Sequence, residues 1–469
     1  MAHSGPPVVT LPSRRRPGWL WLSALMAAVC FEGLGRKFLP FIPATLFYFF
    51  KDVILVAILM MFGMDPHHKK FIRRVMGRPF LVAGGIAFLL TAIQCLNPNQ
   101  SVWFLPLLGL KAYWLWWLAP LAVSALLSHP KDEYRGIRAL ALFSLVISGL
   151  AIIQFAAPSS ASINTYALYE EREMNSVDIV LSTGRARVAS TFSYFTGFSN
   201  YVLLVPPLIL AFALEAGRGR QRPLAYLVLA ASLATVPMTG SRGAVALAAF
   251  NVFLVAWGAG FLRTAVRRRL IVGSVVGGIA GLVLFPEAIG GVMDRFAYKD
   301  TNARMKEFLQ LLPPVAIETL PHPFLGIGTG MTQNVAIALK LYTGPYFFEG
   351  EPSRLLIELG PIGYLAVWTA RLGLTVALVR AAQLLRKGGR GGLAGVALML
   401  AMQAQLARFV SDHVYQSLYF LVAGFVLHAV VNLPQVRASL APTARVRTQK
   451  GQPVRVPIRS PAMPTGRQS

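Results

Sequence analysis

Residues 192–214 read FSYFTGFSNYVLLVPPLILAFAL, an apolar run without a charged side chain, and Arg218, Arg220 and Arg222 follow it closely. A run of this length is long enough for an α-helix to cross the hydrocarbon core of a bilayer, and a basic cluster beyond it is typical of the cytoplasmic end. The pattern recurs in twelve apolar stretches that we expect to span a membrane: residues 18–34, 44–63, 79–96, 105–127, 137–157, 192–214, 223–238, 244–261, 270–286, 359–379, 392–408 and 415–433. The sequence therefore predicts an all-α polytopic membrane protein with about 12 transmembrane helices.

The composition of the 469-residue chain agrees with this fold class, since 55% of the residues are hydrophobic and only 14% are charged. A soluble domain carries about a quarter charged residues. These values exclude a soluble enzyme with one appended anchor, a disordered chain and a disulfide scaffold. Cys30 and Cys95 both lie inside apolar stretches, where packing in the membrane is a better interpretation than a disulfide or a metal site.

The formal net charge of +26 reports membrane topology. Nearly all of the excess lies in segments that are cytoplasmic if the N-terminus is inside, and we therefore expect both termini in the cytoplasm. No basic stretch is interleaved with aromatic residues as in a nucleic-acid-binding module, so nucleic acid is not an expected partner. The expected organisation is a cytoplasmic N-terminal segment (1–17), a transmembrane domain (18–433) and a basic, disordered cytoplasmic tail (434–469).

Two of the segments predicted to be external are long. Residues 158–190 contain a run of acidic residues followed by Arg185, and Arg187 comes within the same turn-rich region. Residues 287–358, between the ninth and tenth predicted helices, form the longest aqueous segment and include Arg304 and many apolar and aromatic residues. Loops of this length in compact proteins are usually functional or disordered, and this composition favours an ordered, functional segment.

Several cationic residues lie at the predicted external ends of the helices. Lys51 and Lys111 fall a few residues inside predicted helices, and Arg242 lies in the short turn of residues 239–244, Thr-Gly-Ser-Arg-Gly-Ala. A charge at this depth is costly and therefore marks a candidate functional site. The alternative is that these side chains snorkel to lipid phosphates; it stays open for Arg242 and is favoured for Lys51. An ion pair between Lys51 and Asp52 is not expected, because adjacent residues do not face each other on a helix.

Two carboxylates and an arginine, Glu349, Glu351 and Arg354, come just before the tenth predicted helix. A carboxylate at a helix N-terminus interacts favourably with the helix dipole, which could by itself account for Glu351. The dipole does not account for an arginine among them, and the group is therefore a candidate site for acid–base chemistry beside an anion. No cluster of His, Asp or Glu has the spacing of metal ligands, so we expect chemistry without a metal or a cofactor.

Three segments of the chain resemble, in the same order, the O-antigen ligase and O-antigen polymerase superfamily of bacterial inner membranes. Residues 184–200 are similar to the arginine-containing entry to a central helix, and residues 239–244 to a short Ser-Arg-Gly-Ala turn. Residues 322–330, His-Pro-Phe-Leu-Gly-Ile-Gly-Thr-Gly, resemble the family's His-Pro-Leu-Leu-Gly-x-Gly-x-Gly segment and lead to Glu-Leu-Gly-Pro-Ile-Gly at 358–363. The resemblance covers about residues 20–430 and implies a GT-C-like glycosyltransferase architecture, with a large periplasmic segment between helices 9 and 10.

The resemblance implies that a sugar hydroxyl attacks the anomeric carbon of a glycan carried on undecaprenyl diphosphate, at the periplasmic face of the inner membrane. It implies that Arg242 stabilises the diphosphate and that Glu349, or Glu351 in its place, acts as the base. Further residues expected to bind the diphosphate or the glycan are Arg185, Arg187, Arg304, Arg354, Lys51 and Lys111. The implied partners are the undecaprenyl-diphosphate-linked oligosaccharide, membrane lipids, and flippase and chain-length regulator proteins.

One departure from the family pattern bears on the reaction. Ligases of this family usually carry a histidine eleven residues before the glycine of Glu-Leu-Gly, and Glu349 occupies that position here. The departure favours the polymerase branch, which joins repeat units into O-antigen or exopolysaccharide. A ligase that transfers finished glycan to lipid A core or to protein stays open. So does a transporter or flippase of lipid-linked glycans, although the chain lacks the matched halves typical of many transporters.

Overall fold

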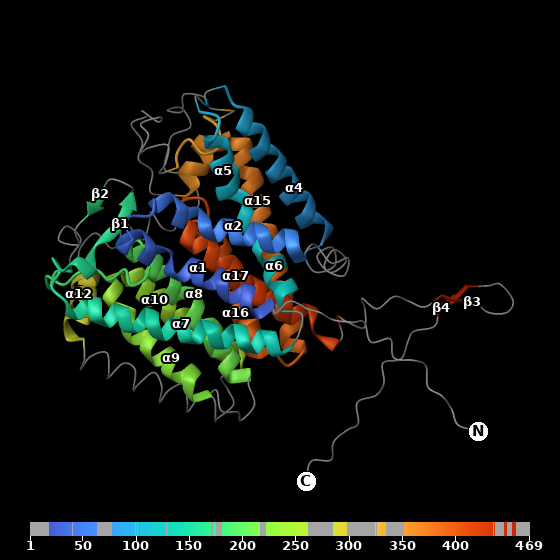
Figure 1. The fold of residues 1–469 in the computed structure, drawn as a ribbon. Coiled ribbons are helices and arrows are strands. Elements are labelled where there is room, and N and C mark those ends of the chain that lie inside the picture. The colour runs from blue at the N-terminus through green and yellow to red at the C-terminus, as the bar shows by residue number, and fades with distance from the viewer. Residues whose placement is uncertain are drawn as a thin grey trace, which may run out of the picture.

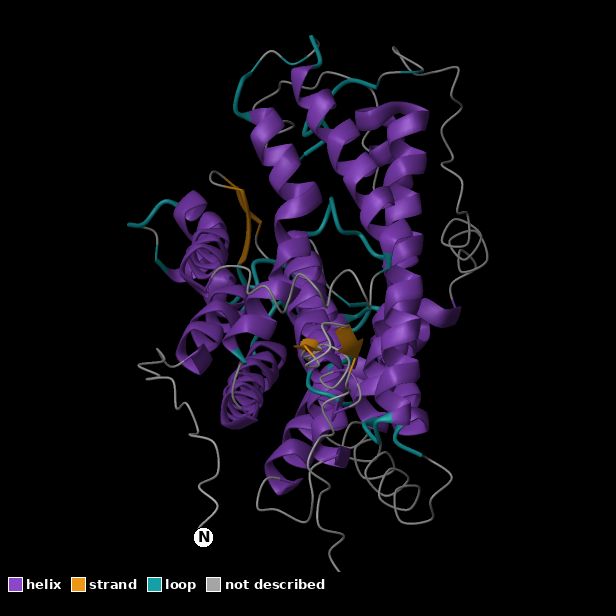
Figure 2. Cartoon of the chain, turned by 90° about the vertical axis from the view of Figure 1, so that its right-hand side faces the viewer, coloured by secondary structure: helices purple, strands orange, loops and turns teal. Residues whose placement is uncertain are grey.

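Figure 1 shows the fold of the chain in a computed structural model. It describes residues 18–39, 41–62, 77–98, 100, 102–127, 130–169, 172–174, 181–215, 222–260, 285–297, 324, 326–333, 351–434, 436, 445–447 and 453–455. Two short antiparallel strand pairs join β1 (Tyr166–Tyr169) to β2 (Arg172–Met174) and β3 (Arg445–Arg447) to β4 (Pro453–Arg455). The rest of the regular structure among these residues is helical, as Figure 2 shows.

The helices are α1 (Gly18–Phe38), α2 (Ala44–Phe62), α4 (Arg78–Ile93), α5 (Leu105–Trp114), α6 (Ala119–Leu126), α7 (Pro130–Ala156), α8 (Phe195–Glu215), α9 (Arg222–Thr235), α10 (Arg242–Gly258), α12 (Pro286–Ala297), α15 (Glu351–Lys387), α16 (Gly391–Leu406) and α17 (His413–Val431). Short 3₁₀ helices are η1 (Gln94–Leu96), η2 (Leu115–Leu118), η3 (Ser162–Asn164) and η5 (Pro237–Thr239). α5, η2 and α6 follow one another without a gap, and Pro106 and Pro120 stand near the starts of α5 and α6. Proline is tolerated in the first turn of a helix, because the N–H that it lacks would have no partner within the helix there.

Within the described residues, seven helical stretches are long and apolar enough to cross a membrane: Gly18–Phe38, Arg78–Leu96, Leu105–Leu126, Asp132–Ala156, Phe195–Glu215, Glu351–Lys387 and His413–Val431. Three shorter apolar helices accompany them, Pro223–Thr239, Arg242–Gly258 and Gly391–Leu406. The chain is therefore a helical, multi-pass membrane protein.

Eleven of the twelve predicted spans overlap a helix of the structure. Nearly all of the ninth span, residues 270–286, lies outside the described residues. The total of twelve crossings stays a prediction, as does the periplasmic position of residues 287–358. Most of that segment also lies outside the described residues.

α8 and α17 form the centre of the bundle. In each of them 83% of the membrane-length window is buried, against 17% in α4, which lies at the edge beside α15. The apolar core around α8 and α17 also takes in side chains from α1, α6, α7, α10 and α16. Helix packing within a bilayer depends on close van der Waals contact, because lipid is as apolar as the side chains.

Glycines permit such contact between α10 and α16. A Cβ atom on Gly395 would lie 2.5 Å from the carbonyl oxygen of Leu254, and one on Gly391 would lie 2.2 Å from the carbonyl oxygen of Gly258. Gly391 and Gly395 are four residues apart and thus face α10 together, in the small-xxx-small pattern of membrane helix pairs.

Arg390 joins the turn between α15 and α16 to α7 and α8, at the end of the bundle that is predicted to be cytoplasmic. It lies between α15 and α16 and donates to Glu215, at the end of α8, at 2.9 Å and to Glu133, near the start of α7, at 3.2 Å. Glu215 also accepts a hydrogen bond from the backbone N–H of Leu393 at 2.7 Å. The turn between α15 and α16 is therefore anchored to two other helices.

α15 is two helices rather than one. Gly360 has φ 66° and ψ 178°, outside the helical region, and Pro361 follows it. Arg371 forms an ion pair with Glu351, although twenty residues of straight helix would hold the two about 30 Å apart. Residues 351–359 therefore form a short helix that turns back along the long helix beginning at Pro361.

Two glycine-to-alanine changes, one at the contact of α10 with α16 and one away from it, should have opposite effects on stability. Gly395→Ala should lower the thermal midpoint of the detergent-solubilised protein, because a methyl group there forces the two backbones apart. Gly149→Ala in α7 has open space around it, and should stabilise the protein by about 0.5–1 kcal/mol through the higher helix propensity of alanine. Equal midpoints for the two variants would contradict the close approach of the helices.

Candidate functional site

Ends of helices that are far apart in sequence meet at one end of the bundle. Asn200, in the second turn of α8, donates from Nδ2 to Asp412 Oδ2 at 2.6 Å, just before α17 begins. Lys37, near the end of α1, donates from Nζ to the carbonyl of Ser190 at 3.2 Å, in the loop that precedes α8. Segments that were predicted to be external therefore share one end of the molecule.

Lys51 is fully buried at this end and is paired. Its side chain is 1% exposed, and Nζ lies 2.5 Å from Glu32 Oε2 of α1 and 2.9 Å from the carbonyl of Tyr48. The other carboxylate oxygen of Glu32 lies 3.6 Å from Arg36. The interpretation of Lys51 as a snorkelling residue is thus wrong, because a carboxylate of another helix lies at the same depth and stabilises the buried ammonium. As expected, the partner of Lys51 is not Asp52.

Lys111 and Asp52 form a second buried pair, between α5 and α2. Lys111 Nζ lies 2.5 Å from Asp52 Oδ2, and Asp52 Oδ1 accepts a hydrogen bond from Trp116 Nε1 at 2.9 Å. Both lysines contact the ring of Tyr48, with Lys111 Nζ 4.0 Å and Lys51 Nζ 4.6 Å from its centroid. Cations over an aromatic face are attracted to its π electrons.

We refer to Arg36, Lys37, Lys51 and Lys111 as the cationic cluster. Together with Glu32 and Asp52 it has a formal net charge of +2, from four basic side chains and two carboxylates. Sequence reasoning selected Lys51 and Lys111 but missed the other members. The signal was present, since an acid such as Glu32 within an apolar helix needs a cation nearby.

Arg187 lies against the turn that leads to Arg242, although the two are far apart in sequence. Its Nε donates to the carbonyl of Thr239 at 3.0 Å, and its guanidinium carbon lies 3.4 Å from the ring centroid of Phe195. A Cβ atom on Gly240 would approach Arg187 Nε to 3.1 Å, and Gly240 has φ 62°, which favours glycine. There is therefore direct contact between residues 184–200 and residues 239–244, the first two segments for which a resemblance was noted.

Arg242 is the first residue of α10, and half-buried. The preceding Ser241 caps the helix, its hydroxyl oxygen accepting from the backbone N–H of Ala244 at 3.3 Å. A cation at the positive end of a helix gains nothing from the helix dipole, so the dipole does not explain why an arginine is here. Arg242 and the helix N-terminus instead add their positive potentials, an arrangement that attracts anions.

Arg185, in the same loop as Arg187, binds a carboxylate of this protein. Its guanidinium forms an ion pair with Glu287 of α12 and donates to the carbonyl of Ala156 at 3.2 Å. The hydrogen bond that Arg185 donates to Glu287 raises the pKa of the guanidinium above its ordinary value. Arg185 thus joins its loop to α12 and the end of α7.

The carboxylate of Glu351 binds groups of the protein itself. Besides Arg371, its carboxylate accepts from the backbone N–H of Val410 at 2.8 Å and from the N–H and hydroxyl of Ser411, both at 3.0 Å. Its side chain is 4% exposed. These contacts favour a structural role, in which Glu351 ties the short helix of α15 to the segment before α17.

Residues 326–333, which we call the glycine-rich segment, contain Gly326, Gly328 and Gly330. Glu358 connects this segment to α5 and to Arg354. Its carboxylate accepts from the hydroxyl of Tyr113 at 2.9 Å, from the N–H of Gly330 at 3.1 Å and from the N–H and hydroxyl of Thr332 at 2.8 and 2.7 Å. Arg354, nearly buried, donates to the carbonyl of Thr332 at 2.8 Å. The position of Arg354 therefore depends on the glycine-rich segment.

The glycine-rich segment also caps the short helix of α15. The N–H of Ile327 donates to the carbonyl of Ile357 at 2.9 Å, and that of Gly328 donates to the carbonyl of Glu358 at 3.1 Å. These carbonyls would otherwise lack partners, because the helix breaks at Gly360. The two last family-like segments are thus paired through their backbones, a contact that their sequence spacing did not reveal.

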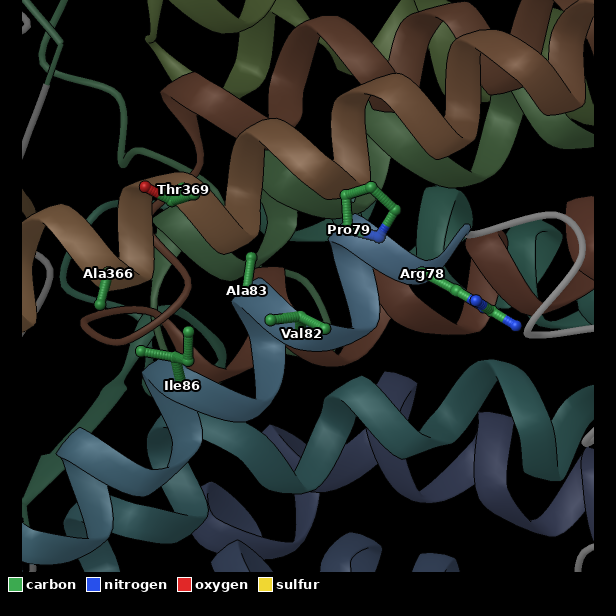
Figure 3. Close-up of a pocket in the computed structure, with 7 residues that line it drawn as sticks. All are labelled: Arg78, Pro79, Val82, Ala83, Ile86, Ala366 and Thr369. Atoms are coloured by element: carbon green, nitrogen blue, oxygen red, sulfur yellow. The ribbon is translucent and has the colours of Figure 1, made fainter.

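An apolar groove of about 590 Å³ lies between α4 and α15, apart from these residues. Figure 3 shows its lining, Arg78, Pro79, Val82, Ala83, Ile86, Ala366 and Thr369. Arg78 is the one charged residue in that lining and begins α4, at the end predicted to be cytoplasmic. The other lining residues offer no acid, base or nucleophile for chemistry. Two candidates for the external site, Glu349 and Arg304, lie outside the described residues.

The contacts of Glu351 predict the effect of removing its charge. Glu351→Gln leaves Arg371 buried without an anion, which should cost about 3–5 kcal/mol of stability and lower the thermal midpoint in detergent. Adding Arg371→Met should recover most of the loss, because no unpaired charge then remains. A Glu351→Gln protein that is as stable as wild type but inactive would instead identify Glu351 as a catalytic group.

No family model matches this chain, and no curated protein matches it either.

Proposed function

We propose that this protein is a glycosyltransferase that polymerises oligosaccharide repeat units carried on undecaprenyl diphosphate, at the periplasmic face of a bacterial inner membrane. The observation that carries the proposal is the contact of Arg187 with the turn leading to Arg242, at the same end of the bundle as the cationic cluster. The resemblance of residues 184–200, 239–244 and 322–330 to O-antigen polymerases and ligases supports the substrate class.

The charge distribution suits a lipid-linked diphosphate. Such a donor carries its negative charge at the membrane surface and its isoprenoid chain in the bilayer, so its site needs cations beside apolar helices. Arginine stays charged at any physiological pH and binds phosphate oxygens bidentately. Arg187 is held by Phe195 and Thr239, and Arg242 stands at a helix N-terminus. We assign these two arginines to the diphosphate.

The cationic cluster would act at longer range. Lys51 and Lys111 already have carboxylate partners. The cluster would therefore act mainly through its formal net charge of +2, which raises the local concentration of an anionic donor. Arg36 donates to the hydroxyl of Ser193 at 3.1 Å, and this contact joins the cluster to the loop that carries Arg187. Arg354 and Arg304 remain further candidates for glycan or diphosphate contacts.

The proposed reaction forms two bonds, one from the acceptor oxygen to carbon and one from the base to a proton, and breaks two. The acceptor hydroxyl oxygen bonds to the anomeric carbon of the donor glycan, the bond from that carbon to the diphosphate oxygen breaks, and the electron pair leaves with the lipid diphosphate. The hydroxyl proton passes to a base. Arg187 and Arg242 stabilise the negative charge that grows on the leaving group. The donor is already activated, so no nucleotide, metal or cofactor is part of the proposal.

The proposal predicts the glycans of a deletion strain and of a strain complemented with Arg242→Lys. Deletion should reduce the surface polymer to a single repeat unit. Arg242→Lys should lower polymerisation by about 10- to 100-fold, because charge-assisted hydrogen bonds worth about 1.5–3 kcal/mol are lost. Arg135→Lys, at an exposed position in α7, should restore the full polymer. Gel analysis of surface glycan at matched membrane expression measures all three.

Other glycan patterns would select another function. Full-length polymer left on its lipid carrier in the deletion strain identifies a ligase. Repeat units confined to the cytoplasmic leaflet identify a flippase. Near wild-type polymer from Arg242→Ala removes this arginine from the proposed site.

A further inference from the structure

His413, the first residue of α17, has a ring nitrogen without a hydrogen-bond partner. Its Nδ1 is shielded from solvent, and no partner for it exists in the part of the chain that the structure describes. Shielded polar atoms are nearly always hydrogen-bonded in proteins, and an exception deserves an explanation in terms of function or of a ligand. The side chain as a whole is half-buried at the external end of the bundle.

The neighbours of His413 are the groups already assigned to the candidate site. Its ring packs edge to face against Tyr48, with centroids 5.4 Å apart, and Tyr48 also contacts Lys51 and Lys111 of the cationic cluster. The charges of Lys111, Lys51 and Arg354 all act on the imidazole. His413 therefore lies where residues of α2, α5 and α15 converge.

Carboxylates at this end of the described structure are committed to other partners. Glu32 and Asp52 bind Lys51 and Lys111, and Glu351 binds Arg371. Glu358 accepts hydrogen bonds from four donors. Asp412 caps α17 through the N–H of Tyr415 and binds Asn200. His413 differs from these carboxylates, because one of its ring nitrogens has no hydrogen-bond partner among the described residues.

The start of α17 holds His413 in a fixed position. Asp412 Oδ1 accepts from the N–H of Tyr415 at 2.9 Å, and Asp412 Oδ2 accepts from Asn200 of α8. The carbonyl of His413 accepts from the hydroxyl of Ser417 at 2.7 Å. These contacts fix the backbone at the start of α17, and the ring of Tyr48 packs against the imidazole.

We propose that His413 accepts the proton of the acceptor hydroxyl; this role rests on the proposed glycosyl transfer. As the oxygen–anomeric carbon bond forms, the hydroxyl O–H bond breaks and its proton moves to an unprotonated imidazole nitrogen. The bond to the lipid diphosphate breaks and takes its electron pair with the leaving group. A neutral imidazole suits this step because its unprotonated ring nitrogen can accept a proton.

The test uses purified full-length protein in liposomes with lipid-linked repeat units as donor and acceptor. His413→Gln and His413→Asn should lower the turnover rate by about 10²–10⁴-fold, the usual contribution of a general base. Donor binding, measured separately from the rise in thermal midpoint that added donor causes in the detergent-solubilised protein, should stay within a factor of about two, because the diphosphate contacts are untouched. His428→Gln is the matched control, since His428 lies in the same helix, near its other end.

The pH dependence separates proton transfer from a structural effect. A base must be unprotonated, so the wild-type rate should fall as the pH drops through the titration of the imidazole. That acid limb should be absent in His413→Gln. Lys51, Lys111, Arg354, Tyr48 and Asp412 face or adjoin His413, and any limb that they cause will persist in the variant.

Three results would overturn the assignment in different ways. Wild-type turnover in both His413 variants would remove the role of His413 alone. Loss of turnover and of the acid limb in Glu349→Gln, with both His413 variants active, would assign the base to Glu349. Wild-type protein that binds but never transfers the donor glycan would overturn the proposed function itself. Thermal midpoints of each variant identify any loss that is due to unfolding.

Discussion

A charge inside an apolar helical bundle must have a partner at its own depth, and this requirement determines how the external end is built. Lys51 and Glu32 join α2 to α1, Lys111 and Asp52 join α5 to α2, and Arg371 and Glu351 join the two parts of α15. Replacing one member of such a pair leaves the other buried and uncompensated, which is far more costly than losing an exposed pair. The arrangement of these helices is therefore specified by side chains that can be satisfied in one geometry only.

The same requirement gives several cations at this end a carboxylate partner within the protein, as Lys51, Lys111 and Arg185 show. Arg187 is positioned by the carbonyl of Thr239 and the ring of Phe195. The formal positive charge that the cationic cluster carries beyond its two carboxylates attracts anions over a longer range.

Apolar length and the position of basic residues were enough to predict most of the helices. The stretch 192–214 became α8, which is Phe195–Glu215, and residues 244–261 overlap α10. The turn back in α15 was missed, although the neighbouring Gly360 and Pro361 are strong breakers of a helix. The ion pair that holds the two parts of α15 together joins residues twenty positions apart, and no local pattern reports such a pair.

The candidate site was predictable in its residue types but not in its contacts. Intramembrane lysines and a turn arginine are costly and therefore conspicuous in a sequence. Their partners are not: Glu32 stands in a different helix from Lys51, and Thr239 is separated from Arg187 by 52 residues. The spacing that placed Glu349 at the position of a ligase histidine says nothing about His413, which reaches the same end of the bundle from α17.

The backbone pairing of the glycine-rich segment with the short helix of α15 has a consequence for how the protein can vary. Gly326 and Gly360 both have positive φ, and a Cβ atom on either would lie within 2.6 Å of a backbone atom of the other segment. Neither segment can change its shape without disturbing the carbonyls and N–H groups of the other. Over evolutionary time the two stretches should thus be inherited as one unit, retained together or lost together.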